Sequence, residues 1–204
     1  MRTIKAAGEH ELDVRRSRFR CALAPVTSQD QARDFVQQRR RAHPDARHHC
    51  SAFVLGDDGE FQKSSDDGEP AGTAGTPMLE VLRHNEITNT VAVVTRYFGG
   101  VLLGAGGLVR AYGSAVSATL EQVGTVERRA MRMISTTVDY GVAGRLENEL
   151  RAAGYRLADV DYRESVRLHI LVPESGVPEF RTWIAETTGG AAEPELGELG
   201  YSEV

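Results

Sequence analysis

Two passages of the sequence, one acidic and the other rich in glycine, carry the residue types that could do chemistry. The acidic passage spans positions 65–75 and contains three carboxylates in the order Ser-Asp-Asp-Gly-Glu-Pro. The second passage spans positions 91–107, where an apolar, β-branched stretch leads into a loop with five glycines. Glycine lets the backbone approach a partner closely, so we interpret the two passages as the candidate site.

The glycine-rich loop precedes an expected helix. Uncapped amides and the positive end of a helix dipole favour a phosphate at such a position. The spacing matches neither the dinucleotide fingerprint nor a Walker loop, since no lysine follows, and a nucleoside triphosphatase is disfavoured. The glycines could also serve only turns and close strand–helix contacts. The candidate residues for binding phosphate or RNA are Arg96, Tyr97, Gly99, Gly100, Gly104, Gly106, Gly107 and Arg110.

Two arginines bracket this loop. Arg110 falls in the first turn of the expected helix, where a cation is unfavourable unless an anion lies nearby. That anion could be a bound phosphate, or the acidic motif Asp66, Asp67 and Glu69 in an internal salt-bridge network with Arg96 and Arg110. The acidic motif could also hold magnesium or supply an acid and a base, but a structural turn is the favoured interpretation. No serine or cysteine forms a recognisable nucleophile pair with a histidine, and we expect no catalytic residue, metal or cofactor.

One basic cluster could contact a nucleic-acid backbone through charge. A solvated helix end is the alternative, because cations there favour the helix dipole. The aromatic residues Tyr97, Phe98 and Tyr112 could stack on bases, or could pack in the core. The basic patch consists of Arg39, Arg40, Arg41, Arg47 and His49, with Arg15, Arg16 and Arg18 upstream.

Hydrophobic periodicity and turn residues predict the elements that must position these residues. In the first part of the chain Ser28 caps an expected helix that closes before Pro44, and Thr76-Pro77 begins another. In the stretch 91–95, the residues that would face either side of a sheet are apolar or β-branched, which predicts a central strand covered on both sides. A long helix is expected to begin within residues 104–107 and to end at Gly124. The remaining expected strands of this part are 19–26, 49–55 and 61–64.

The second part of the chain alternates as β-α-β-β-α-β, the ferredoxin-like order. Its predicted strands are 130–140, 156–162, 165–172 and 191–197, and its predicted helices are 144–153 and 178–188. With 204 residues, two domains are expected, 1–124 and 125–204, in an α+β protein whose first domain is an α/β sandwich.

Composition limits the class of protein. Hydrophobic residues make up 41% and charged residues 26%, which is typical of soluble globular proteins, and no apolar stretch reaches about 20 residues. We therefore expect a cytoplasmic protein without membrane contact. The two cysteines suit buried reduced thiols better than a disulfide framework or a zinc site. Of 24 basic and 29 acidic residues, 15 of each precede Gly124, so the net charge of -5 lies in the second domain, which favours a basic protein partner there.

Three motifs together carry a resemblance to a known family. They are His49-Cys50-Ser51-Ala52, the passage from Ser65 to Pro77, and the passage from Val93 to Tyr112. In these motifs the chain resembles the Impact family, in its bacterial, two-domain YigZ-like branch. The resemblance implies a first domain similar to domain IV of elongation factor G and to a ribosomal-protein domain, a second domain similar to domain V of that factor, and an association with translation.

The leading hypothesis is a non-enzymatic, translation-associated protein that contacts RNA or the ribosome through the glycine loop and the basic patch. An acidic chain is unusual for such a protein, so binding would depend on a local patch. One alternative is a small-molecule enzyme that binds a phosphorylated metabolite or nucleotide at the loop, with magnesium on Asp66 or Asp67, as in the GHMP-type kinases of the same fold superfamily. Another alternative is a protein-interaction module. The sequence does not predict an oligomeric state.

Overall fold

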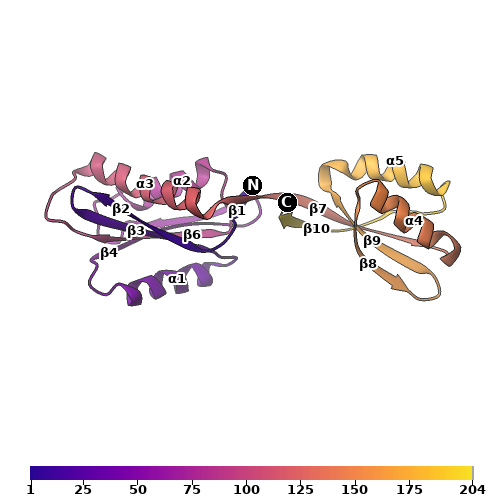
Figure 1. Cartoon of the computed structure of the whole chain (residues 1–204), viewed down its shortest axis with the longest axis horizontal. Coiled ribbons are helices and arrows are strands. Elements are labelled where there is room, and N and C mark those ends of the chain that lie inside the picture. The colour runs from indigo at the N-terminus through magenta and orange to yellow at the C-terminus, as the bar shows by residue number, and fades with distance from the viewer. Residues whose placement is uncertain (204) are drawn as a thin grey trace. The chain divides into compact units, whose positions relative to one another are not determined.

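The computed structural model describes residues 1–203, and the chain divides into two compact units, Met1–Arg128 and Arg129–Val204 (Figure 1). Both units combine helices with an antiparallel sheet, so the protein belongs to the α+β class. None of the helices in residues 1–203 combines the length and apolar content that a membrane crossing requires.

The first unit is built around a five-stranded antiparallel sheet in the order β2-β3-β6-β4-β5. Its strands are β2 (Gly8–Val14), β3 (Ser17–Pro25), β4 (His48–Leu55), β5 (Phe61–Ser65) and β6 (Thr90–Tyr97). Its helices are α1 (Gln29–Ala42), α2 (Gly75–His84) and α3 (Ala105–Val123). A short strand, β1 (Arg2–Ile4), pairs instead with the start of β7 (Thr125–Val138), at Arg2↔Glu127 and Ile4↔Thr125.

Helices cover both faces of this sheet, with α2 and α3 on one face and α1 on the other (Figure 1). Alternate residues of the central strand β6 serve the two layers. Ala92 and Val94 pack in the core under α2 and α3, and Val91 and Val93 pack in the core under α1. This two-sided burial accounts for the uninterrupted apolar run that predicted a covered central strand.

The helix starts differ in their caps. Ser28 Oγ accepts a hydrogen bond from the Gln31 amide at 3.2 Å and so caps α1. At the start of α3 the N-cap is Gly104, with φ 73°, and no side chain caps that end. The glycine is needed there because few other residues adopt a positive φ.

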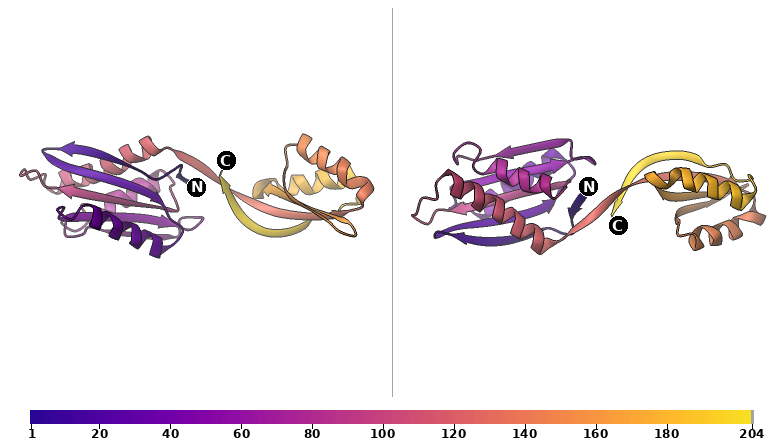
Figure 2. Two further views of the ribbon diagram at one scale, coloured as in Figure 1. Left: turned by 60° about the horizontal axis from the view of Figure 1, so that its bottom comes forward. Right: turned by 90° about the horizontal axis from the view of Figure 1, so that it is seen from above.

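The second unit has the element order β-α-β-β-α-β. It comprises β7, α4 (Tyr140–Ala152), β8 (Arg156–Tyr162), β9 (Val166–Pro173), a 3-10 turn (Glu174–Gly176), α5 (Val177–Thr188) and β10 (Glu195–Glu203). In the sheet, β9 lies between β7 and β8, and β10 pairs with β7. Figure 2 shows α4 and α5 on one face of this sheet. The core between them contains Ile134, Leu146, Ile170 and Phe180.

The structure differs from the predicted elements mainly at the chain's N-terminus and in the length of two strands. Strands β1 and β2 were not predicted, and β7 begins at Thr125 because its first residues pair with β1. Strand β10 begins at Glu195, after the turn at Gly189 and Gly190, where Ala192 is buried in the core instead of lying in a strand.

Candidate functional site

The acidic turn that precedes α2 is stabilised by hydrogen bonds from its own backbone amides to the side chain of Asp66. Asp66 Oδ1 accepts hydrogen bonds from the amides of Ala74 and Gly75, at 3.0 and 2.8 Å, and Oδ2 accepts one from Gly72 at 2.8 Å. Burial alone would raise the pKa of Asp66, but together these amide bonds lower it below its ordinary value. The ionised side chain of Asp66 therefore stabilises the conformation of the turn.

Asp67 has a similar structural role beside strand β4. Its Oδ2 accepts a hydrogen bond from the His49 amide at 2.6 Å, and its Oδ1 pairs with Arg40. Burial opposes ionisation of Asp67, but the bonds from Arg40 and His49 lower its pKa overall. Since both oxygens of Asp66 and of Asp67 already accept hydrogen bonds, a magnesium ion would have to displace them.

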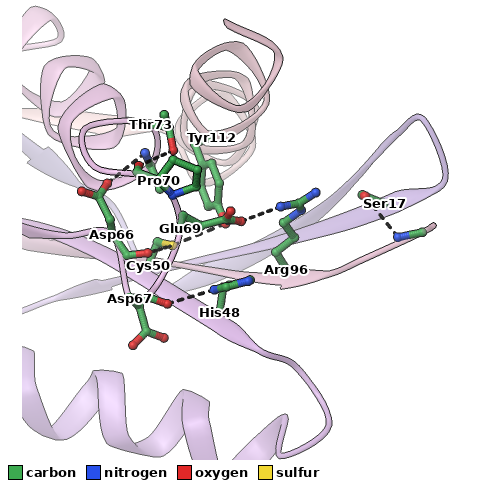
Figure 3. Close-up of polar contacts among 12 residues, drawn as sticks. Ser17, His48, Cys50, Asp66, Asp67, Glu69, Pro70, Thr73, Arg96 and Tyr112 are labelled. Carbon is green, nitrogen blue, oxygen red and sulfur yellow. Dashed lines mark hydrogen bonds and ion pairs between the residues drawn. The ribbon is translucent and has the colours of Figure 1, made fainter. Parts of the chain in front are cut away.

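Glu69 lies at the centre of a buried polar network (Figure 3). Its Oε1 accepts hydrogen bonds from Arg96 Nη1 at 2.7 Å and from the Tyr112 hydroxyl at 2.8 Å. The Cys50 thiol donates to the Asp66 carbonyl at 2.9 Å and also lies 3.4 Å from the Tyr112 hydroxyl. Burial raises the pKa of Cys50 to about 12, and burial with the neighbouring Cys50 and Glu69 raises the pKa of Tyr112, which therefore remains a donor.

Arg96 is thus an internal cation and not a surface phosphate ligand. The residue is only 6% exposed, and its guanidinium is close to the rings of Phe19 and Phe98, at 5.4 and 5.6 Å. The acidic turn and β6 meet through the Arg96–Glu69 pair. Arg110, the second arginine of the sequence prediction, is exposed and makes no hydrogen bond or ion pair with any residue in 1–203.

Three loops meet at the end of the sheet where β6 leads into α3, drawn at the left of Figure 1. The β2–β3 turn lies against the β6–α3 loop, because the Gly99 amide donates to Ser17 Oγ at 3.2 Å and a side chain on Gly99 would meet the Arg16 carbonyl. The loop after α1 also reaches this end, where His43 Nδ1 lies 2.8 Å from the Tyr97 hydroxyl.

These loops, the last turn of α1 and the beginning of α3 carry exposed guanidiniums that we call the arginine rim. Among residues 1–203, none of its members makes a side-chain hydrogen bond or ion pair. The rim comprises Arg15, Arg16, Arg41, Arg47 and Arg110.

The remaining residues of the predicted basic patch have other roles. Arg39 pairs with Glu9 at 2.7 Å, and Arg40 pairs with Asp67. His49 is buried, and burial together with Arg40 lowers its pKa, so it is uncharged at neutral pH. Only Arg41 and Arg47 of the patch are exposed and unpaired in the described part of the chain.

A pocket of about 340 Å³ lies at the start of α3, beside the rim. One side is polar, with Arg47, His48, Glu69 and Arg96, and the other is apolar. The sequence prediction had not named the lining leucines as site residues, and their signal would have been the two adjacent leucines in the glycine-rich loop. The apolar side and the helix start contribute Pro70, Phe98, Leu102, Leu103, Gly104, Ala105 and Leu108.

The other predicted glycines and aromatic residues divide between the pocket and its supports. Gly100 and Gly104 have positive φ values, 83° and 73°, with open space around them, and Gly106 and Gly107 form the first turn of α3. Tyr97 is partly buried beneath Arg18, whose guanidinium carbon lies 4.7 Å from the ring centre.

The second unit contains a serine–histidine contact that sequence spacing did not reveal. Ser135 Oγ lies 2.9 Å from His169 Nδ1, and His169 Nε2 lies 3.4 Å from Asp161 Oδ2, across strands β7, β9 and β8. The nearest comparison is a catalytic triad, which also needs donors for an oxyanion. Strand β7 is paired on both sides within the sheet, so the amides beside Ser135 belong to a ladder. We therefore interpret the three side chains as polar contacts between neighbouring strands of the sheet.

Comparison with known proteins matches both units of the chain. Residues 15–120 match the Impact N-terminal domain, and residues 136–191 match a domain of unknown function, DUF1949. The IMPACT family member YvyE of Bacillus subtilis (strain 168) is 47% identical over 98% of this chain and 93% of its own length. The IMPACT family member YigZ of Escherichia coli (strain K12) is 39% identical over 88% of this chain and 89% of its own length. A crystal structure of a hypothetical protein is 37% identical, with a TM-score of 0.62 over 97% of both chains.

Proposed function

The chain belongs to the IMPACT family, as a two-domain bacterial member close to YvyE and YigZ, and on this premise we propose that it is a non-enzymatic protein that binds RNA through the arginine rim. The ribosome is the proposed source of that RNA. This choice is supported by what the family resemblance implies, a similarity to domains IV and V of elongation factor G.

The observation that carries the proposal is the β2–β3 turn. Val14 pairs with Ser17, and the two residues between them, Arg15 and Arg16, have φ values of 47° and 68°. A turn with two positive φ values favours Asn-Gly, and a non-glycine residue there costs about 1 kcal/mol or more. Two exposed arginines thus occupy positions where other residues would stabilise the fold better. Backbone strain of this kind, beside unpaired charge, supports a binding role.

Local charge balance supports the same surface even though the chain is acidic overall. Four carboxylates of this region are already paired: Glu11 with Arg20 at 3.0 Å, and Glu9, Asp67 and Glu69 with the arginines described above. Two exposed carboxylates close to the rim in the chain, Asp13 and Asp45, make no ion pair within residues 1–203, so the five rim arginines leave a smaller net positive charge. Phosphate contacts from exposed arginines depend on such a local excess and not on the charge of the whole protein.

Two variants with equal loss of charge test the proposal. In the rim variant, Arg15→Asn and Arg16→Gly remove two charges and supply the residues that the turn prefers, so its unfolding free energy should rise by about 1–2 kcal/mol. Its affinity for a fluorescent single-stranded RNA should fall, and the slope of log affinity against log salt should decrease by about 0.7 for each phosphate that the variant no longer neutralises. Anisotropy measures both quantities, and gradient sedimentation at low salt measures ribosome association.

The matched control carries Arg33→Gln and Arg83→Gln, which remove two exposed charges elsewhere in the first unit. Its RNA affinity and salt slope should equal those of the wild type. Because the rim variant should be the more stable protein, weaker binding could not result from unfolding. Wild-type protein that bound neither RNA nor ribosomes at any salt concentration, or a rim variant with unchanged affinity, would reject the proposal.

A further inference from the structure

The pocket at the start of α3 is built differently from the arginine rim beside it. The rim consists of solvated charges, which attract any polyanion, whereas the pocket combines an enclosed carboxylate, free amides and an apolar wall. Its volume of about 340 Å³ is at the small end of the range for sites that hold a small molecule or a single residue of a polymer. A surface for non-specific charge attraction does not require such a mixture.

The start of α3 supplies donors for one phosphate. Gly104 provides no side-chain cap for this 19-residue helix, and the first backbone bond that closes its first turn is from Leu108 to Gly104, at 3.0 Å. The amides of Ala105, Gly106 and Gly107 therefore remain free for an anion. Arg47 lines the same pocket, and Arg110 lies one turn into the helix.

Glu69 gives a second and independent indication of a ligand. The residue is only 9% exposed and lines the pocket, and its Oε1 accepts both bonds of the internal network. Its Oε2 accepts no hydrogen bond from any residue in 1–203. The neighbouring Arg96 Nε is also buried without a partner in that range. Glu69 Oε2 itself is not fully buried, so this oxygen is accessible to a ligand that brings a hydrogen-bond donor.

The apolar wall suits a planar ring. Phe98 is 51% exposed and Leu102 is 82% exposed, and both line the pocket with the less exposed Leu103. Unstacked RNA bases are commonly held against such aromatic and apolar side chains. A base in this position would have its edge near Glu69 and its phosphate near the amides of α3.

We infer that the pocket receives one unstacked guanine nucleotide of single-stranded RNA, with the base edge donating to Glu69 Oε2 and the phosphate on the amides at the start of α3. The inference rests on the proposed RNA binding and gives it a preferred base. Guanine presents adjacent imino and amino donors on its Watson–Crick edge. Adenine and cytosine each present one donor beside an acceptor, and uracil presents one donor between two acceptors, so a carboxylate ranks guanine first.

The experiment measures binding of the full chain to four short uridine-rich RNAs that differ at one central position, which is guanine, inosine, adenine or uracil. The guanine strand should bind about 10-fold more tightly than the uracil strand, since a well-matched base contact discriminates by that order. Inosine lacks the amino group and should fall between them.

Two variants locate the preference in the pocket. Glu69→Gln should remove most of the advantage of guanine, provided that a thermal melt shows a folded protein. Phe98→Ala, at an exposed side chain, should weaken all four strands, and Phe61→Ala, which removes a ring of similar exposure on β5, should weaken none.

Failure of this inference can be distinguished from failure of the proposed function. Equal affinity of the wild type for all four strands, with salt-dependent binding intact, would overturn the guanine pocket and leave the arginine rim standing. The same conclusion would follow if Phe98→Ala and Phe61→Ala behaved alike. Absence of RNA binding by the wild type would overturn both proposals.

Discussion

At the scale of single residues, Glu69 joins two elements of the first unit through one buried carboxylate. It neutralises a guanidinium that β6 carries into the core, and it accepts the hydroxyl of Tyr112 from α3. A buried ion pair adds little stability compared with an apolar pair of the same shape, but removing one partner leaves the other charge unpaired in a low dielectric. The carboxylate of Glu69 therefore both stabilises the first unit and lines the pocket.

We predict that Glu69→Gln lowers the unfolding free energy by about 3–5 kcal/mol, because it leaves the buried Arg96 cation without its anion. The double variant with Arg96→Met should recover part of this loss. Urea denaturation followed by circular dichroism measures both variants.

The control is Asp30→Asn, which breaks an exposed ion pair with Arg33, where the two side chains are 87% and 63% exposed. Exposed pairs contribute about 0–1 kcal/mol. A Glu69→Gln protein no less stable than the Asp30→Asn protein would contradict the role given to the buried pair.

At the scale of elements, the site depends on contact between the β2–β3 turn and the β6–α3 loop. These segments are far apart in the sequence, and the close approach of Gly99 to the backbone of residue 16 joins them. A methyl group on Gly99 would lie 2.0 Å from the Arg16 carbonyl oxygen, so the two loops would have to separate. At Gly106, in the first turn of α3, the nearest atom to an added methyl is Arg110 Nη1, at 3.9 Å.

Two alanine substitutions should therefore have opposite effects on stability. Gly99→Ala should destabilise the first unit by about 1–3 kcal/mol through this clash, whereas Gly106→Ala should stabilise it by up to about 1 kcal/mol through helix propensity. Thermal unfolding measures both. Equal melting temperatures for the two variants would show that the loops are not held together at Gly99.

The elements that the sequence predicted well are those with one dominant physical signal. The capping residue Ser28 and the hydrophobic periodicity after it predicted α1, and the apolar run in β6 predicted a central strand. Strand β2 was missed because acidic residues alternate with Gly8, His10, Leu12 and Val14, a pattern with few apolar residues. Its pairing with β3 depends on the rest of the sheet, which no local pattern describes.

The site was predictable as a region but not as a set of surface groups. Glycine and charge spacing located the acidic turn and the β6–α3 loop. Whether an arginine near them faces solvent depends on strand register: Arg96 pairs with His48 and Phe19, which places it inside the unit, although it adjoins an exposed loop. Sequence spacing equally could not show that Ser135 and His169 face each other, since that contact follows from the register of β7 and β9.

At the scale of the whole molecule, each unit has a hydrophobic core of its own. Residues of the first unit form the clusters around Phe19 and Phe53, and those of the second form the cluster around Phe180. Strand β7 contributes to both units, since Thr125–Glu127 pair with β1 and Met131–Val138 pair with β9. The docking of a basic partner on the acidic second unit stays a prediction from the sequence.

Because β7 pairs with β1, the residue at which the chain is truncated should affect the stability of the first unit. A fragment of residues 1–128 keeps the β1–β7 ladder and the Arg128–Asp57 ion pair, which spans 3.0 Å, whereas a fragment of residues 1–124 has neither. We predict that the longer fragment is more stable by about 1–3 kcal/mol, the order expected for a few backbone hydrogen bonds. Urea denaturation of the two fragments beside the full chain measures the difference, and equal midpoints would show that β1 does not depend on β7.

The burial of both thiols has a practical consequence for following ligand arrival. The chain has two cysteines, and burial raises the pKa of Cys21 and of Cys50 to about 12, so neither supplies a thiolate at neutral pH. A cysteine introduced at Leu102, which is 82% exposed on the lip of the pocket, would then be the one position that a maleimide dye modifies. The two native cysteines would thus contribute no labelling signal, and a fluorophore at position 102 would report on the pocket alone.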